Sequence, residues 1–169
     1  MNTTTSTPNP IIFDLIALTK PRVNFLIIFT AIVGMLLAQD FNLNYGLMIY
    51  ASIGIYLAAS AAAVINQIVD QKIDAIMDRT KSRPLIKGNV TAKHAIYFSL
   101  VISMVSTYIL YEFVNTITMI LTLFSIIVYS IIYSVYLKNL TSQNIVIGGI
   151  AGAMPVSYTH LTLPTTRHV

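Results

Sequence analysis

Long apolar stretches separated by short polar segments dominate this chain. Four of them, at about 23–38, 45–69, 95–113 and 116–137, approach or exceed the roughly 20 apolar residues with which a helix crosses a bilayer core. An apolar segment at 11–18, ended by Pro21, predicts a helix in the membrane interface. A fifth apolar run begins at Ile145 but gives way to Pro155 and polar residues after about half a membrane thickness. The pattern predicts an all-α membrane protein, a multi-span helical bundle.

The composition agrees with this fold class. Hydrophobic residues make up 56% of the 169 positions, charged residues only 9%, and the mean hydropathy is +0.75. The chain has no cysteine, which excludes disulfides and thiolate metal sites within it. The lipid bilayer is therefore the expected surrounding of most of the chain.

The basic residues predict an orientation. They precede the first stretch, separate the second from the third and follow the fourth: Lys20 and Arg22, then Lys72, Arg79, Lys81, Arg83, Lys87 and Lys93, then Lys138. The positive-inside rule places these segments, with the N-terminus, in the cytoplasm. A bacterial inner (plasma) membrane is the simplest location. The net charge of +4 belongs to this topology and gives no indication of nucleic-acid binding.

Small residues occupy one part of the second stretch. The run 58–63 reads Ala-Ala-Ser-Ala-Ala-Ala, and such residues let helix backbones approach closely in a membrane. We therefore expect this run to form a close-packing face.

An acidic stripe follows the second stretch. Asn66, Asp70, Asp74 and Asp78 recur every four residues, which places them along one side of a continuous helix. Carboxylates about 6 Å apart repel by roughly 3 kcal/mol at an effective dielectric near 20, so stability alone does not favour the pattern. Mg²⁺ would remove this repulsion, since it prefers carboxylate oxygens and shares its other positions with waters and phosphates. A solvated acidic helix end followed by a basic loop is the structural alternative.

Basic residues next to the stripe favour an anionic ligand. Arg79, Lys81 and Arg83 could hold phosphate oxygens, with the arginines able to make bidentate contacts. Asn66 lies inside an apolar stretch, where polar side chains are costly and usually face a cavity or another helix. A site of this kind suits a molecule with an anionic head and a long apolar tail, such as a prenyl diphosphate.

Three segments carry a resemblance to a known family. They are Leu18-Thr19-Lys20-Pro21-Arg22-Val23, then Asn66-x3-Asp70-x3-Asp74-x2-Met77-x-Arg79-Thr80-x2-Arg83-Pro84-Leu85, and lastly Tyr133-Ser134, Leu137-Lys138, Thr141, 144–149, 151–153 and Pro155. In this order they resemble the UbiA-type intramembrane prenyltransferases, and within them the protohaem IX farnesyltransferases (haem O synthases). The resemblance runs from about Ile12 to Pro155 and implies the first half of a UbiA-type fold.

The resemblance implies transfer of a farnesyl group from farnesyl diphosphate to a vinyl group of haem B, with addition of water, to give haem O. It implies that Asn66, Asp70 and Asp74 hold Mg²⁺ against the diphosphate. The cationic side chains that it assigns to the diphosphate are Arg79 and Arg83, followed by the weaker candidates Lys20, Arg22 and Lys138. Asp78 lies at a variable position of the motif and is left out of the site. The sequence does not indicate whether a haem A synthase or a terminal oxidase is an assembly partner.

The chain departs from the family pattern near its end. Asn139 stands where a second basic residue is usual, and the segment after Pro155 does not continue the family sequence into a second Asp-rich motif. We expect a cytoplasmic N-terminus with an interfacial helix at 1–22, a partial prenyltransferase domain at 23–155 and a foreign tail at 156–169. With half of a two-motif metal site, the chain is expected to be inactive alone.

Two other functions stay open on the sequence. One is a related prenyltransferase acting on an aromatic or quinone precursor, although the tail of the Asp-rich motif from Met77 to Pro84 favours haem. The other is a non-enzymatic transporter or assembly factor whose acidic stripe binds a cation. The stripe lies at a helix end and not near the middle of a span, where transport sites usually lie, so this function ranks last.

Overall fold

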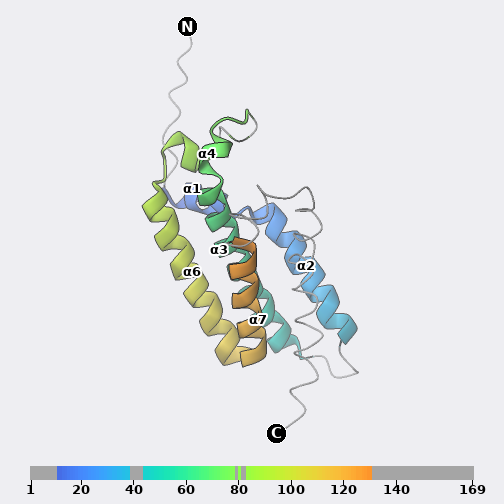
Figure 1. Ribbon diagram of the computed structural model, residues 1–169. Coiled ribbons are helices and arrows are strands. Elements are labelled where there is room, and N and C mark those ends of the chain that lie inside the picture. Colours follow the sequence, from blue (N-terminus) through green and yellow to red (C-terminus); the bar gives the residue numbers. More distant parts are fainter. Residues whose placement is uncertain (1–10, 39–43, 79, 81–82, 131–169) are drawn as a thin grey trace.

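The computed structural model describes residues 11–38, 44–78, 80 and 83–130, and every regular element in these ranges is a helix (Figure 1). In chain order the helices are α1 (Ile11–Leu18), α2 (Pro21–Ala38), α3 (Tyr45–Val69), α4 (Gln71–Asp74), α5 (Pro84–Lys87), α6 (Ala92–Phe113) and α7 (Thr116–Ile127). The predicted all-helical fold is confirmed, and α1 and α3 have the predicted bounds. The fifth apolar run and the tail lie outside the described residues.

Two helices, α3 and α6, are long and apolar enough to cross a membrane. The pair α1 and α2 passes the same test as one span bent by 47°, which makes up to three spans in the described ranges. The apolar helix that includes α7 runs to Ser130 and is shorter than a span. Its predicted end at residue 137 lies beyond the part that the structure describes.

Side-chain caps fix where three of the helices begin. Asn44 Oδ1 accepts a hydrogen bond from the Leu47 amide at 3.1 Å, before α3. Thr91 Oγ1 accepts one from the His94 amide at 3.3 Å, before α6, and Asn115 Oδ1 accepts one from the Thr118 amide at 2.7 Å, before α7. Each cap satisfies a backbone donor that lacks a helical partner and stabilises its helix by about 1 kcal/mol.

Helix α3 lies at the centre of the bundle and contacts α1, α2, α6 and α7 (Figure 1). Its close approach to α6 occurs at Gly54, where a Cβ would lie 2.5 Å from Leu110 Cδ2. Ser106 Oγ on α6 donates a hydrogen bond to the Gly54 carbonyl at 2.7 Å. Within the run 58–63 all residues except the half-buried Ala59 are buried, in agreement with the predicted close-packing face.

Two apolar clusters support this arrangement. Leu18, Val64, Leu85, Val90 and Ala95 bring α1, α3, α5 and α6 together at the end of the bundle that carries the Asp-rich segment. The other cluster packs the far half of α2 against the first half of α3 and is formed by Ala31, Met35, Met48, Ala51 and Ile55. Large apolar side chains elsewhere on α2 and α6 are exposed, as expected of helices that face lipid.

The acidic stripe does not lie on one continuous helix, so the prediction is wrong for Asp78, its last member. Helix α3 ends at Val69 with Asp70 as its C-cap, α4 is a single turn, and Asp78 follows in an exposed turn. Thr80 Oγ1 donates hydrogen bonds to the carbonyls of Asp74, at 2.9 Å, and Met77, at 3.2 Å, so the chain folds back after α4. The continuous apolar run stops at Val69, the later apolar residues Ile76 and Met77 are exposed, and like charges at four-residue spacing weaken a helix that has little core to pack against.

Candidate functional site

Three members of the predicted stripe remain together at the end of α3. The Asp70 amide donates to the Asn66 carbonyl at 3.0 Å, and the Asp74 amide donates to the Asp70 carbonyl at 2.8 Å. These bonds carry the helical register from α3 through Asp70 into α4. Asn66, Asp70 and Asp74 are 8%, 5% and 5% exposed, whereas Asp78 is exposed. The two carboxyl groups and the side-chain amide are therefore buried, and they follow one another at intervals of one helical turn.

Arg83 brings a positive charge to this set. Its guanidinium forms an ion pair with the Asp74 carboxylate. The Arg83 amide donates to the Thr80 carbonyl at 3.1 Å, and Pro84 opens α5 immediately afterwards, which fixes the backbone beside α4. Asp74 is nearly buried and Arg83 is 26% exposed, so the pair offsets the cost of removing the carboxylate from water.

The other predicted cations differ in their placement. Lys20 is half-buried between α1 and α2, and Arg22 on the first turn of α2 is exposed. Arg79, Lys81 and Lys138 lie outside the described residues. Of the predicted diphosphate ligands, the structure therefore brings Arg83 to the acidic set and leaves Arg22 on the surface.

The donor set is suited to a hard cation. Asn66, Asp70 and Asp74 offer amide and carboxylate oxygens, and Mg²⁺ is commonly held by one or two carboxylates together with phosphate oxygens and water. Within the described ranges, no group of three or more histidine, aspartate or glutamate side chains is placed to hold a metal ion. The residues present thus fit a magnesium ion shared with a phosphate-bearing ligand, and do not form a closed protein cage.

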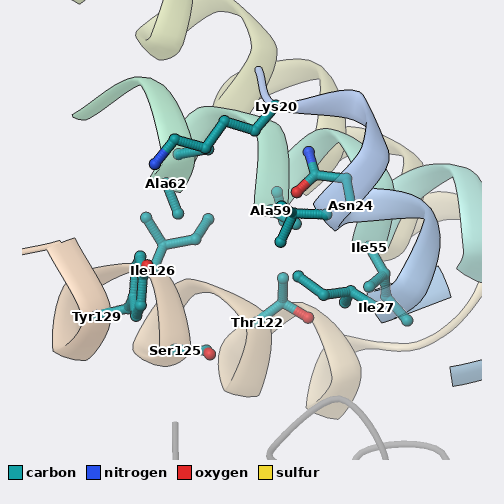
Figure 2. Close-up of a pocket in the computed structure, with 13 residues that line it drawn as sticks. Lys20, Asn24, Ile27, Ile55, Ala59, Ala62, Thr122, Ser125, Ile126 and Tyr129 are labelled. Atoms are coloured by element: carbon teal, nitrogen blue, oxygen red, sulfur yellow. The ribbon is translucent and has the colours of Figure 1, made fainter. Parts of the chain in front are cut away.

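An apolar cavity of about 220 Å³ lies between α2, α3 and α7 (Figure 2). Its α3 wall includes Ala62 and Ala63, one turn before Asn66. Figure 2 shows Lys20, just before α2, and Ile27 of α2 on one side, with Thr122 of α7 and Tyr129, just after α7, on another. The small side chains of α3 leave this space open, and Asn66 follows one turn after them on the same helix.

Three buried polar side chains near the cavity were not singled out from the sequence. Asn24 on α2 and Gln67 on α3 are 2% and 4% exposed and donate hydrogen bonds to the segment between α1 and α2. Thr122 on α7 lines the cavity, is 4% exposed, and its Oγ1 has no hydrogen-bond partner within the described structure. Asn24 and Gln67 carry the signal that was used for Asn66, a polar residue inside an apolar stretch, and could have been found with it.

Comparison with known proteins decides the family. The model of the UbiA prenyltransferase family matches residues 27–162, which is most of the chain. The chain belongs to the UbiA prenyltransferase family. The matched region includes α3, the acidic set and the cavity-lining residues from Ile27 onward. The family assignment agrees with the all-helical fold and identifies the apolar helices as those of a multi-pass membrane protein.

Several curated relatives of this UbiA-family chain are protoheme IX farnesyltransferases. This chain is 49% identical over 142 residues to a protoheme IX farnesyltransferase of Hahella chejuensis, and the alignment covers 84% of this chain and 48% of the relative. Proteins of the same name from Ruthia magnifica and Alcanivorax borkumensis are 52% identical over 148 residues and 51% identical over 144 residues. These alignments cover 86% and 84% of this chain, and 50% and 48% of the relatives. The chain thus spans about half the length of the curated relatives it matches. No solved structure matches it.

Proposed function

We propose that this chain carries the prenyl-donor site of an intramembrane farnesyltransferase, which moves the farnesyl group of farnesyl diphosphate to a vinyl group of haem B and gives haem O. The observation that carries the proposal is the buried set Asn66, Asp70 and Asp74, with Arg83 paired to Asp74, on the helix whose residues Ala62 and Ala63 line an apolar cavity one turn before Asn66. The names of the relatives supply the choice of haem as acceptor. An inner membrane, with this end of the bundle in the cytoplasm, is part of the proposal.

Polar and charged residues would bind the diphosphate head of the donor. Asn66, Asp70 and Asp74 would hold Mg²⁺, which when bound neutralises charge on the diphosphate leaving group. Arg83 keeps a planar cation beside Asp74, where it can bind phosphate oxygens as their charge grows. Lys20 at the cavity adds a second cation. Arg22, Arg79 and Lys138 are proposed as further contacts of the same diphosphate.

The cavity walls would enclose the apolar farnesyl group of the substrate. Ala58, Ala59, Ala62 and Ala63 line it together with isoleucines from α2, α3 and α7. An apolar enclosure excludes bulk water from the allylic carbon as its bond to the diphosphate oxygen breaks, so the carbon reacts with the electron pair of the vinyl group. The farnesyl group then forms a carbon–carbon bond with the vinyl group, and diphosphate leaves with the electron pair of the broken bond. Water adds through its oxygen to the carbocation left on the other vinyl carbon and loses a proton, which gives the hydroxyl group of the product.

A hybrid protein tests the proposal. Residues 1–155 of this chain are joined to the remaining part of the Hahella chejuensis relative and expressed in membranes that lack haem O synthase. Farnesyl diphosphate, haem B and Mg²⁺ should yield haem O, measured by chromatography and mass spectrometry. The chain alone should yield none. The same mixture with 4-hydroxybenzoate in place of haem B should give no prenylated product.

Each other outcome points to a different function. Prenylated 4-hydroxybenzoate without haem O would favour an aromatic acceptor. If neither product forms and the hybrid binds Mg²⁺ but no farnesyl diphosphate, a cation-binding transporter or assembly factor is favoured. Haem O made by the chain alone would contradict the expected inactivity of the unpaired half site.

A further inference from the structure

We propose that Gln67 and Asn24 are positioning residues, which hold the α1–α2 corner so that Lys20 binds the anionic head of a prenyl diphosphate. The α1–α2 corner is the segment Leu18-Thr19-Lys20, between the end of α1 and Pro21 at the start of α2. The inference rests on the proposed function and adds to it two residues that do not belong to the acidic set.

The corner breaks the helical hydrogen-bond pattern, and side chains replace it. Gln67 Nε2 donates to the Leu18 carbonyl at 2.6 Å, across 49 positions of the sequence. Asn24 Nδ2 donates to the Thr19 carbonyl at 2.8 Å and also to Ser60 Oγ on α3 at 2.8 Å. The Lys20 carbonyl accepts from the amides of Val23 and Asn24, which begin α2. Two amide side chains therefore tie successive corner carbonyls to α3.

Burial makes these bonds hard to replace. Leu18 is fully buried, Thr19 is 6% exposed, and Asn24 and Gln67 are 2% and 4% exposed. Water has little access to these carbonyls, so loss of a donor would leave an unsatisfied acceptor in an apolar environment. The corner would then shift until its carbonyls found other partners.

The backbone of Lys20 depends on this support. Lys20 has φ +51°, a left-handed conformation that residues with a Cβ rarely adopt, and no other described residue except glycine has positive φ. A strained backbone of this kind persists where its surroundings determine it, and it is found preferentially at functional sites. Here the hydrogen bonds from Gln67 and Asn24 fix the two carbonyls that precede Lys20.

The corner lies beside the turn of α3 that carries Asn66, which gives its geometry a functional consequence. Gln67 follows Asn66 directly on α3, so its bond to Leu18 places the corner against the turn that carries Asn66. Figure 2 shows the Lys20 side chain extended along one end of the cavity, which it lines together with Ala62. A flexible lysine directed from a fixed backbone supplies a compact positive charge at the end of the cavity next to this turn, where the anionic head of the donor can bind.

A purely structural role of Gln67 would change stability and ligand binding in a different way. Carbonyls at a broken membrane helix must be satisfied in any case, and side chains commonly do this. If that were the whole role of Gln67, its loss would lower stability and would affect ligand binding independently of Lys20. A positioning role acts through Lys20 and disappears when Lys20 is absent.

A double-mutant cycle separates the two roles. Equilibrium binding of radiolabelled farnesyl diphosphate with Mg²⁺ is measured on the 169-residue chain in phospholipid nanodiscs, for Gln67→Met, Lys20→Met and the double variant. Methionine keeps the length and apolar volume of glutamine without its amide. Ser106→Ala is the matched control, because Ser106 Oγ also donates to a backbone carbonyl, that of Gly54, away from the corner. Thermal unfolding of each variant reports stability separately from binding.

We expect Lys20→Met to raise the Kd about tenfold and Gln67→Met about fivefold, with the double variant no weaker than Lys20→Met alone. Ser106→Ala should lower stability and leave the Kd unchanged. An unchanged Kd in Gln67→Met or Lys20→Met, or losses that add in the double variant, would overturn the inference and leave the proposed function standing. Absence of binding by the parent chain would overturn both. If Gln67→Met does not fold, Asn24→Leu replaces it in the same cycle.

Discussion

Arg83 and Asp74 form an ion pair that ties the loop before α5 to the one-turn helix α4. The pair joins a nearly buried carboxylate to a guanidinium that still reaches solvent. It lies where the proposed function places the diphosphate of the donor. The same arginine therefore satisfies an acidic residue in the free protein and offers its remaining donors to an anionic ligand.

Loss of Arg83 should destabilise this end of the bundle. In Arg83→Met the Asp74 carboxylate would stay buried without its counter-charge, at a cost of about 1–3 kcal/mol in the free energy of unfolding. The double variant Arg83→Met, Asp74→Asn should recover part of this loss, because the unpaired charge is removed. Unfolding of detergent-solubilised protein, followed by circular dichroism, measures the change. Equal losses in the single and double variants would show that the pair is not what stabilises the loop.

The acidic set should be needed for binding of the donor. Asp70→Asn and Asp74→Asn should each abolish Mg²⁺-dependent binding of farnesyl diphosphate and formation of haem O by the hybrid, because one hard oxygen ligand loses its charge. Asp78→Asn is the matched control, since this exposed carboxylate follows α4 and does not belong to the proposed set. Removal of Mg²⁺ with EDTA should reproduce the Asp70→Asn result in the parent. Retained binding in EDTA would contradict the metal role.

Packing of α3 on α6 should be sensitive to Gly54. A Cβ at this position would lie 2.5 Å from Leu110 Cδ2 and 2.6 Å from its Cγ, and Leu110 is 1% exposed. Gly54→Ala should therefore lower the free energy of unfolding by about 1–3 kcal/mol, through overpacking. Adding Leu110→Ala to Gly54→Ala should make the glycine replacement less costly than it is in the parent. An equal cost of the replacement in both backgrounds would show that Leu110 does not limit the approach of the two helices.

Local sequence signals predicted much of the fold, because they coincide with physical ends of helices. Asn44 caps α3 at its start, and the continuous apolar run of this helix stops at Val69, so its bounds could be read directly. Pro21 ends the apolar segment 11–18 and opens α2. The four-residue spacing from Asn66 to Asp74 also survives in the structure, since backbone hydrogen bonds carry the helical register across Asp70.

Contacts between distant segments could not be predicted in this way. The spacing to Asp78 looks the same as the spacings before it, yet the chain leaves the helix because Thr80 bonds back to Asp74. The pairing of Arg83 with Asp74 requires that loop to reverse direction. A residue before proline favours extended backbone, whereas Lys20 is left-handed because distant residues hold the corner.

The cavity should distinguish donors by the length of their tails. Ala58→Leu replaces a methyl group by an isobutyl group on the cavity wall two turns before Asn66, and this should fill space meant for an isoprenoid. We expect the Kd for farnesyl diphosphate to rise about tenfold and the Kd for dimethylallyl diphosphate, which has the same head and a short tail, to change less than twofold. Ile49→Phe, on an exposed face of α3 away from the cavity, should change neither value. Competition with radiolabelled farnesyl diphosphate measures both. A parallel loss for the two donors would place the effect of Ala58→Leu on the anionic head and not on the tail.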